Sequence, residues 1–111
     1  MTLHLCFCLN ISTYGIHAIV SPNAKASILI KIVLPLGLKI LMCCNNEINK
    51  LDNLPPGLQR LECSYDKLIQ LDNLPPGLIK LYCRNNNFQY DFIPTLENIR
   101  THNANKLALA N

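Results

Sequence analysis

An eight-residue segment, LDNLPPGL, occurs twice in the chain, at 51–58 and again at 71–78. The two copies are twenty residues apart. A fixed period of this size is typical of repeat proteins, in which each unit buries its apolar side chains against the next unit because it cannot bury them alone. The repeat therefore predicts a stacked array whose function depends on an extended surface.

Aligning residues 31–50, 51–70 and 71–90 shows a shared frame, LxxLxCxxNxL, after each proline-glycine run. Its cysteine and asparagine positions hold Cys43, Cys63 and Cys83, and Asn46, Asp66 and Asn86. The fourth and sixth residues of the frame share one side of an extended chain, because side chains alternate along a strand. We expect them to face inward, with Met42, Glu62 and Tyr82 facing outward. Stacking then aligns the strands in a parallel sheet.

The frame resembles the leucine-rich repeat, with cysteine in place of its third leucine. The LPPGL unit is similar to repeats of secreted bacterial effectors, and the cysteine-bearing form to repeat proteins of large amoeba-infecting DNA viruses. The resemblance covers residues 34–88. It implies a leucine-rich-repeat solenoid with a short parallel β-sheet on the concave face and an extended, turn-rich convex side with little helix. The Pro-Pro-Gly run agrees, since proline lacks a backbone donor and favours extended geometry before it.

The length of 111 residues fits a single repeat domain. We expect residues 1–33 to form a degenerate N-terminal unit or a cap, 34–90 three clear repeats, and 91–111 a degenerate fourth repeat and a tail. The fourth unit rests on Leu96, Ile99, Thr101 and Leu107. Near the N-terminus, Leu3, Cys6 and Cys8 also fit the start of the frame.

Two membrane interpretations of the apolar N-terminal third are disfavoured. Residues 1–11 resemble the apolar part of a secretory signal, with Ala24 and Ala26 as the small residues of a cleavage site, but a positively charged start is missing and polar residues intervene. A helix over 27–44 would carry two lysines and be interrupted by Pro35 and Gly37, whereas a membrane span needs about twenty mostly uncharged residues. We expect an intracellular protein, in the host cytoplasm.

The chain has six cysteines, which in a secreted protein would suggest a disulfide scaffold. Three of them recur at a core position of the frame, and free cysteine behaves as a small buried hydrophobe. Adjacent coils can bring two such thiols near disulfide distance, but three in a row cannot all pair with one another. A zinc ladder is disfavoured because zinc takes four tetrahedral ligands. We therefore expect structural thiols in a reducing compartment, with no metal and no cofactor.

The asparagine position predicts hydrogen bonds between coils. Where the chain turns away from the sheet, an asparagine side chain can bond backbone groups of its own and the adjacent coil. Asp66 departs from this pattern, because an ionised carboxylate accepts hydrogen bonds but cannot donate them. We expect the substitution Asp66→Asn to stabilise the domain modestly.

No catalytic constellation is visible. The chain has no phosphate-binding loop, nucleophile elbow or zinc-protease motif, and His4, His17 and His102 are scattered. Cys63 lies near Asp66 in sequence, but the frame places it inward, where an unactivated thiol is inert. We expect a non-enzymatic protein.

The outward positions of the stacked strands predict a binding face. Tyrosine and arginine are the residue types most able to anchor a protein interface. The predicted face consists of Arg60, Glu62, Tyr65, Lys80, Tyr82, Arg84 and Arg100. An ordinary solvated surface is the alternative for the same positions, since charged strand faces also keep a protein soluble.

A net charge of +3 and a pI near 8.6 are too mild for a surface that follows nucleic-acid phosphates. We therefore expect a protein–protein interaction module that binds a protein partner, such as a host protein, through the concave strand face, with no membrane role. Two alternatives are a substrate-recognition adaptor for a ubiquitin ligase carried on another chain, and a non-functional repeat remnant.

Overall fold

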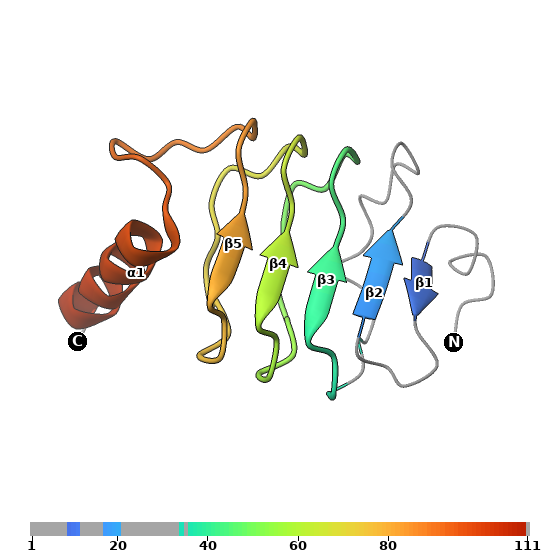
Figure 1. Ribbon diagram of the computed structural model, residues 1–111. Coiled ribbons are helices and arrows are strands. Elements are labelled where there is room, and N and C mark those ends of the chain that lie inside the picture. The colour runs from blue at the N-terminus through green and yellow to red at the C-terminus, as the bar shows by residue number, and fades with distance from the viewer. Residues whose placement is uncertain (1–8, 12–16, 21–33, 35, 111) are drawn as a thin grey trace.

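The computed structural model describes residues 9–11, 17–20, 34 and 36–110. Within these residues the chain forms one five-stranded sheet and a helix near the C-terminal end (Figure 1). The elements are β1 (Leu9–Ile11), β2 (His17–Val20), β3 (Ile40–Met42), β4 (Arg60–Glu62), β5 (Lys80–Tyr82) and α1 (Leu96–Ala110). The expected repeat start at Leu3, Cys6 and Cys8 lies outside the described residues.

The strands lie in the sheet in sequence order, and β2 to β5 are parallel. Leu41 of β3 lies opposite Leu61 of β4, which lies opposite Leu81 of β5, so the register equals one twenty-residue repeat. Strand β1 pairs with β2 in the antiparallel direction. The predicted parallel sheet is therefore confirmed, and β2 adds a fourth parallel strand upstream of the three repeats.

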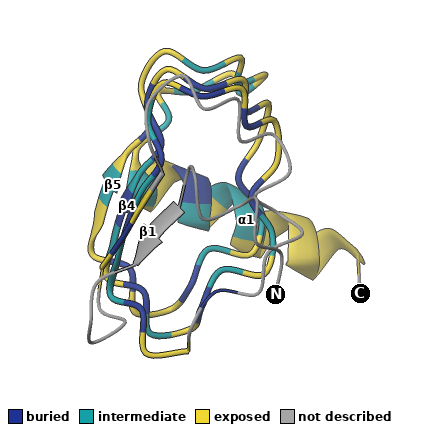
Figure 2. Cartoon of the chain, turned by 90° about the vertical axis from the view of Figure 1, so that its right-hand side faces the viewer, coloured by how far each residue is buried: buried dark blue, intermediate teal, exposed yellow. Residues whose placement is uncertain are grey.

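Between β3, β4 and β5, the chain returns through turns and irregular segments. The amides of Leu58 and Leu78 each donate to the carbonyl of the first proline of the preceding Pro-Pro-Gly run, at 3.1 Å. No residue between 36 and 95 is helical, which agrees with proline's missing donor. Seen from the end of the sheet, successive twenty-residue segments follow nearly the same path (Figure 2).

The apolar side chains of the frame point into the space between the strands and the return segments. Each coil contributes leucines and one cysteine at twenty-residue spacing. The buried set from the three repeats is Leu34, Leu38, Leu41, Cys43, Ile48, Leu51, Leu58, Leu61, Cys63, Leu68, Leu71, Leu78 and Cys83. Burying a leucine side chain stabilises a fold by about 2 kcal/mol. Stacking is therefore the main source of stability, because a coil on its own would leave these side chains in water.

The three frame cysteines are buried and free. Burial raises the pKa of Cys43 and Cys63 well above the usual thiol value, and raises that of Cys83 to about 11. A thiol with a raised pKa stays protonated at neutral pH and reacts slowly. These side chains therefore fill the core.

The asparagine position of the frame connects neighbouring coils through hydrogen bonds. Asn86 Nδ2 donates to Cys63 O of the coil before it at 2.9 Å and to Cys83 O of its own coil at 3.0 Å. Its Oδ1 accepts from Leu68 N of the preceding coil at 3.0 Å. Asn46 Nδ2 donates to the carbonyls of Cys43 and Cys44. The side chain thus replaces backbone partners that the turning chain cannot supply.

A helix, α1, lies in the region where the sequence predicts a degenerate fourth repeat and a tail. Thr95 caps its first turn, because Thr95 Oγ1 accepts from Asn98 N at 3.1 Å. Only Ile99 is fully buried, and Asn103 Nδ2 donates to Leu71 O of the last coil at 2.9 Å. Figure 1 shows α1 beyond β5, at the opposite end of the array from β1. The helix therefore covers the last coil, as a terminal cap does in stacked repeats.

Candidate functional site

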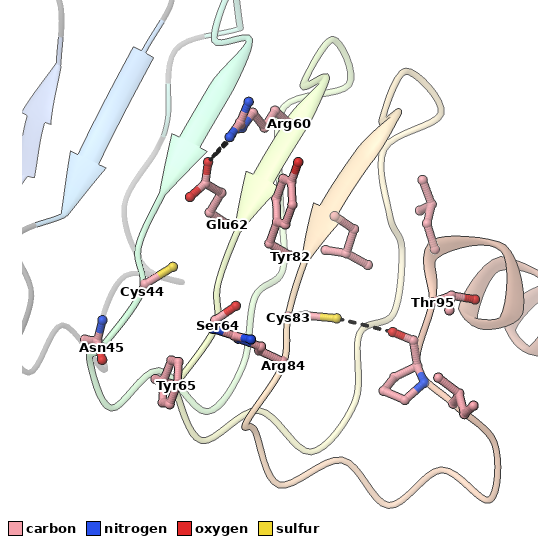
Figure 3. Close-up of a pocket in the computed structure, with 14 residues that line it drawn as sticks. Cys44, Asn45, Arg60, Glu62, Ser64, Tyr65, Tyr82, Cys83, Arg84 and Thr95 are labelled. Carbon is pink, nitrogen blue, oxygen red and sulfur yellow. Dashed lines mark hydrogen bonds and ion pairs between the residues drawn. The ribbon is translucent and has the colours of Figure 1, made fainter.

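A groove lies along β4 and β5 and the turns that follow them, and it is lined by outward side chains and, at the β5 end of the sheet, also by Leu81 and Cys83 (Figure 3). Its volume is about 780 Å³. Five of the seven side chains predicted for the binding face line it, namely Arg60, Glu62, Tyr65, Tyr82 and Arg84. They share this face because side chains alternate along each strand and the register pairs Arg60 with Lys80 and Glu62 with Tyr82.

The other side of the groove is formed by the segment that leads into α1. Ile93, Pro94, Thr95 and Leu96 line it, and Ile93 is 75% exposed. Cys83 Sγ donates to Pro94 O at 3.5 Å, which joins this segment to the end of β5 (Figure 3). The sequence interpretation missed this wall, because it treated residues 91–111 as a further repeat.

Arg60 is neutralised within the groove. Its Nε and Nη2 both lie 2.7 Å from Glu62 Oε2. Its guanidinium carbon also lies 5.1 Å from the centre of the Tyr82 ring, within the range of a cation–π contact. Glu62 is the only acidic residue among those that line the groove. The Arg60 charge is thus balanced within the groove.

Arg84 is in a different position. Its guanidinium carbon lies 5.7 Å from the centre of the Tyr65 ring, and no ion pair of Arg84 occurs within the described part of the chain. Its side chain is exposed. The groove therefore holds one arginine paired with a carboxylate and one arginine whose charge is available to a ligand.

Tyr65 adopts a left-handed backbone conformation, with φ of 59°. The equivalent residues of the neighbouring coils, Asn45 and Asn85, have φ of 61° and 58°. Asparagine tolerates this region, whereas a bulky side chain there costs about 1–2 kcal/mol. Tyr65 is also 47% exposed. The second coil therefore has a tyrosine with a strained backbone at the groove, where the other two coils have asparagine.

Two predicted side chains lie elsewhere. Lys80 begins β5 beside Arg60 but does not line the groove. Arg100 is on α1, and its Nη2 donates to Pro75 O at 2.8 Å and to Pro76 O at 3.4 Å. The sequence predicts Arg100 among the outward positions of the stacked strands. In the structure its guanidinium instead joins α1 to the Pro-Pro-Gly turn before β5.

The groove combines aromatic, apolar and charged side chains with two thiols. Cys44 and Cys83 are the thiols that line it, and burial raises the pKa of both above the usual thiol value. Among the described residues, no three His, Cys, Asp or Glu side chains are grouped closely enough to hold a metal ion. The groove instead combines two half-exposed tyrosines, an exposed isoleucine and an unpaired arginine.

No protein-family model, curated protein or solved structure matches this chain. In the described ranges, none of the helical structure has the length and apolar character that crossing a membrane requires.

Proposed function

We propose that the chain is a short leucine-rich-repeat solenoid that binds a protein partner through the outward face of its strands, without catalysing a reaction. The twenty-residue frame, the parallel strands in sequence order and the constant register between them support the solenoid assignment. The three buried free thiols support a reducing, intracellular setting, such as the cytoplasm of a host cell.

The observation that carries the binding proposal is the groove itself. Side chains from two consecutive coils, Arg60, Tyr65 and Arg84 among them, line one groove together with Ile93. Tyrosine and arginine dominate the energetics of protein interfaces because they combine a large apolar contact area with directed hydrogen bonds. A net charge of +3 is too small for tight binding to nucleic-acid phosphates.

A capture experiment with a matched control tests the proposal. The chain is immobilised under reducing conditions, incubated with amoebal cytosol, and the bound proteins are quantified by mass spectrometry. The groove variant combines Tyr82→Ala and Arg84→Glu. The control combines Ile69→Ala and Lys67→Glu, because Ile69 and Tyr82 are both 46% exposed and neither Ile69 nor Lys67 lines the groove.

The proposal predicts a protein that the unmodified chain and the control retain and the groove variant loses. Far-UV circular dichroism establishes that all three chains are folded alike. Equal retention by the groove variant and the control would contradict binding through the groove.

A further inference from the structure

Resting on the proposed function, we propose that the groove binds an extended acidic segment of the partner. A carboxylate of that segment pairs with Arg84, and an adjacent apolar side chain packs against the exposed surface to which Tyr65 and Tyr82 contribute.

The charges of the groove indicate that its ligand carries a carboxylate. Arg60 and Glu62 cancel one another, with 2.7 Å between donor and acceptor. Arg84 has no such partner among the described residues. An arginine guanidinium presents planar donors that match the two oxygens of a carboxylate. A groove with one unpaired arginine is complementary to a single acidic side chain, whereas a polyphosphate backbone requires a dense basic stripe.

The exposed aromatic and apolar surfaces of the groove indicate that the ligand residue next to the carboxylate is apolar. Tyr65 and Tyr82 expose about half of their surface, and Ile93 exposes most of its surface on the opposite wall. Tyr65 and Tyr82 come from consecutive coils, so an extended ligand that lies along the groove can contact both rings (Figure 3). A volume of about 780 Å³ is within the range of sites for short ligands, and a few peptide residues fit it.

The strain at Tyr65 is an independent observation that points to the same place. The frame has asparagine at this turn in the first and third repeats, where the left-handed conformation is tolerated. The second repeat instead holds a tyrosine at φ of 59°, with its ring beneath the Arg84 guanidinium. Backbone strain is characteristically retained where it serves recognition. The ring supports Arg84 from one side and leaves the other side of the guanidinium for a ligand.

A library of random linear dodecapeptides displayed on phage tests this inference. The baits are the unmodified chain, Arg84→Ser, and Lys67→Glu as a control for surface charge outside the groove. Serine is the residue that the second repeat has at the equivalent position, Ser64, and glutamate is the residue that the first repeat has at Glu47. Both substitutions are therefore compatible with the coil.

We expect the unmodified chain and Lys67→Glu to select peptides in which Asp or Glu adjoins an apolar residue. For a synthetic peptide of that kind, Arg84→Ser weakens binding about tenfold or more, because a charge-assisted hydrogen bond is lost. Changing the acidic residue of the peptide to its amide gives the same loss, and the two changes together give no further loss. Tyr65→Asn also weakens binding while leaving the chain at least as stable.

Selected peptides without acidic residues, or equal affinity for Arg84→Ser and the unmodified chain, would overturn the inference and leave the proposed function standing. Failure to select any peptide would also overturn it, since the proposed ligand is a linear segment. The capture experiment with amoebal cytosol decides the proposed function separately, because that partner can present a folded surface.

Discussion

The turn after β4 and the turn after β5 occupy the same place in consecutive repeats, but their central polar side chains differ. Asn86, in the turn after β5, accepts from Leu68 N and donates to the carbonyls of Cys63 and Cys83. Asp66, in the turn after β4, accepts from Asn46 N at 3.0 Å and Ile48 N at 3.3 Å through Oδ1. Its Oδ2 is buried and has no hydrogen-bond partner. Both side chains therefore accept hydrogen bonds from the neighbouring coil, but only Asn86 also donates hydrogen bonds to backbone carbonyls.

Burial increases the energetic cost of leaving Asp66 Oδ2 without a hydrogen-bond partner. Asp66 is only 6% exposed, and burial raises its pKa from 3.8 to about 6, although the amides of Ile48 and Asn46 favour the ionised form. A protonated Oδ2 can donate a hydrogen bond, whereas an ionised one cannot. The comparison teaches that asparagine supplies both the acceptor and the donor of the link between coils, whereas the aspartate of the second turn can donate only when it is protonated.

Asn86→Asp should have the largest effect, because it makes the third turn resemble the second. The variant loses the donors to Cys63 O and Cys83 O and places a carboxylate oxygen near them. We expect a loss of about 2–3 kcal/mol in the free energy of unfolding at pH 7.5, measured by urea denaturation. Asn87→Asp adds the same charge at an exposed neighbouring residue and should cost less than about 0.5 kcal/mol. Equal effects of the two variants would show that charge alone is responsible.

The second prediction concerns pH. The pKa of Asp66 is higher in the folded chain than the ordinary value of 3.8, so its contribution to stability is complete below about pH 4 and is lost as pH rises through about 6. For this group alone, we expect the free energy of unfolding to fall by about 2 kcal/mol between pH 4.5 and 7.5. The neighbouring thiols of Cys43 and Cys63 stay neutral in this range, because burial raises the pKa of each.

The contribution of Asp66 to this pH dependence is the part that Asp66→Asn removes. Urea unfolding of both chains at several pH values gives the difference, from which other carboxylates cancel. A difference that is constant with pH would contradict the assignment.

Asp66→Asn should stabilise the chain at pH 7.5 by about 1–2 kcal/mol, because it supplies the missing donor in the second turn. The measurement is the midpoint and slope of urea denaturation. Asp91→Asn is the matched control, since Asp91 is exposed and forms no ion pair within the described residues. A variant less stable than the unmodified chain would mean that the carboxylate is better satisfied in this turn than the comparison implies.

Tyr65→Asn should have the smallest effect on stability, a gain of about 0.5–1 kcal/mol. Relief of the left-handed strain, about 1–2 kcal/mol, exceeds the loss of the contact with Arg84, about 0.5–1 kcal/mol. The reverse exchange, Asn85→Tyr, should destabilise the chain by about 1 kcal/mol at the equivalent turn. Thermal unfolding followed by circular dichroism measures both. If the two variants shift the midpoint in the same direction, backbone strain is not the cause.

The sequence was sufficient to predict the parts of the fold that repeat. Leu41 and Leu61 are buried opposite one another, and Glu62 and Tyr82 lie on the outward side, because twenty-residue spacing and strand alternation together fix the register and the facing. The same rules predicted that Arg60, Tyr65 and Arg84 share a surface. Periodic positions can be predicted from a single sequence, because the repeats can be aligned with one another.

The parts that do not repeat were not predictable in the same way. Helix α1 forms in the region of the expected fourth repeat because Thr95 caps it, Glu97 lies in its first turn, and no proline or glycine interrupts 96–110. These helix signals are present in the sequence, but Leu96, Ile99 and Leu107 also fit the spacing of the repeat frame. The position of Ile93 beside the groove could not be predicted from the sequence, because it depends on the path of an irregular segment. The strain at Tyr65 likewise required the backbone geometry.

The pKa of Asp66 in the folded chain tests most directly whether the coils stack as described, because only stacking removes this carboxyl group from water. It can be measured by following the side-chain carboxyl carbon of Asp66 by nuclear magnetic resonance as pH changes, with Asp66→Asn to assign the signal. The account predicts a midpoint of about 6. A midpoint at or below 3.8, the ordinary value of an aspartate, would contradict it.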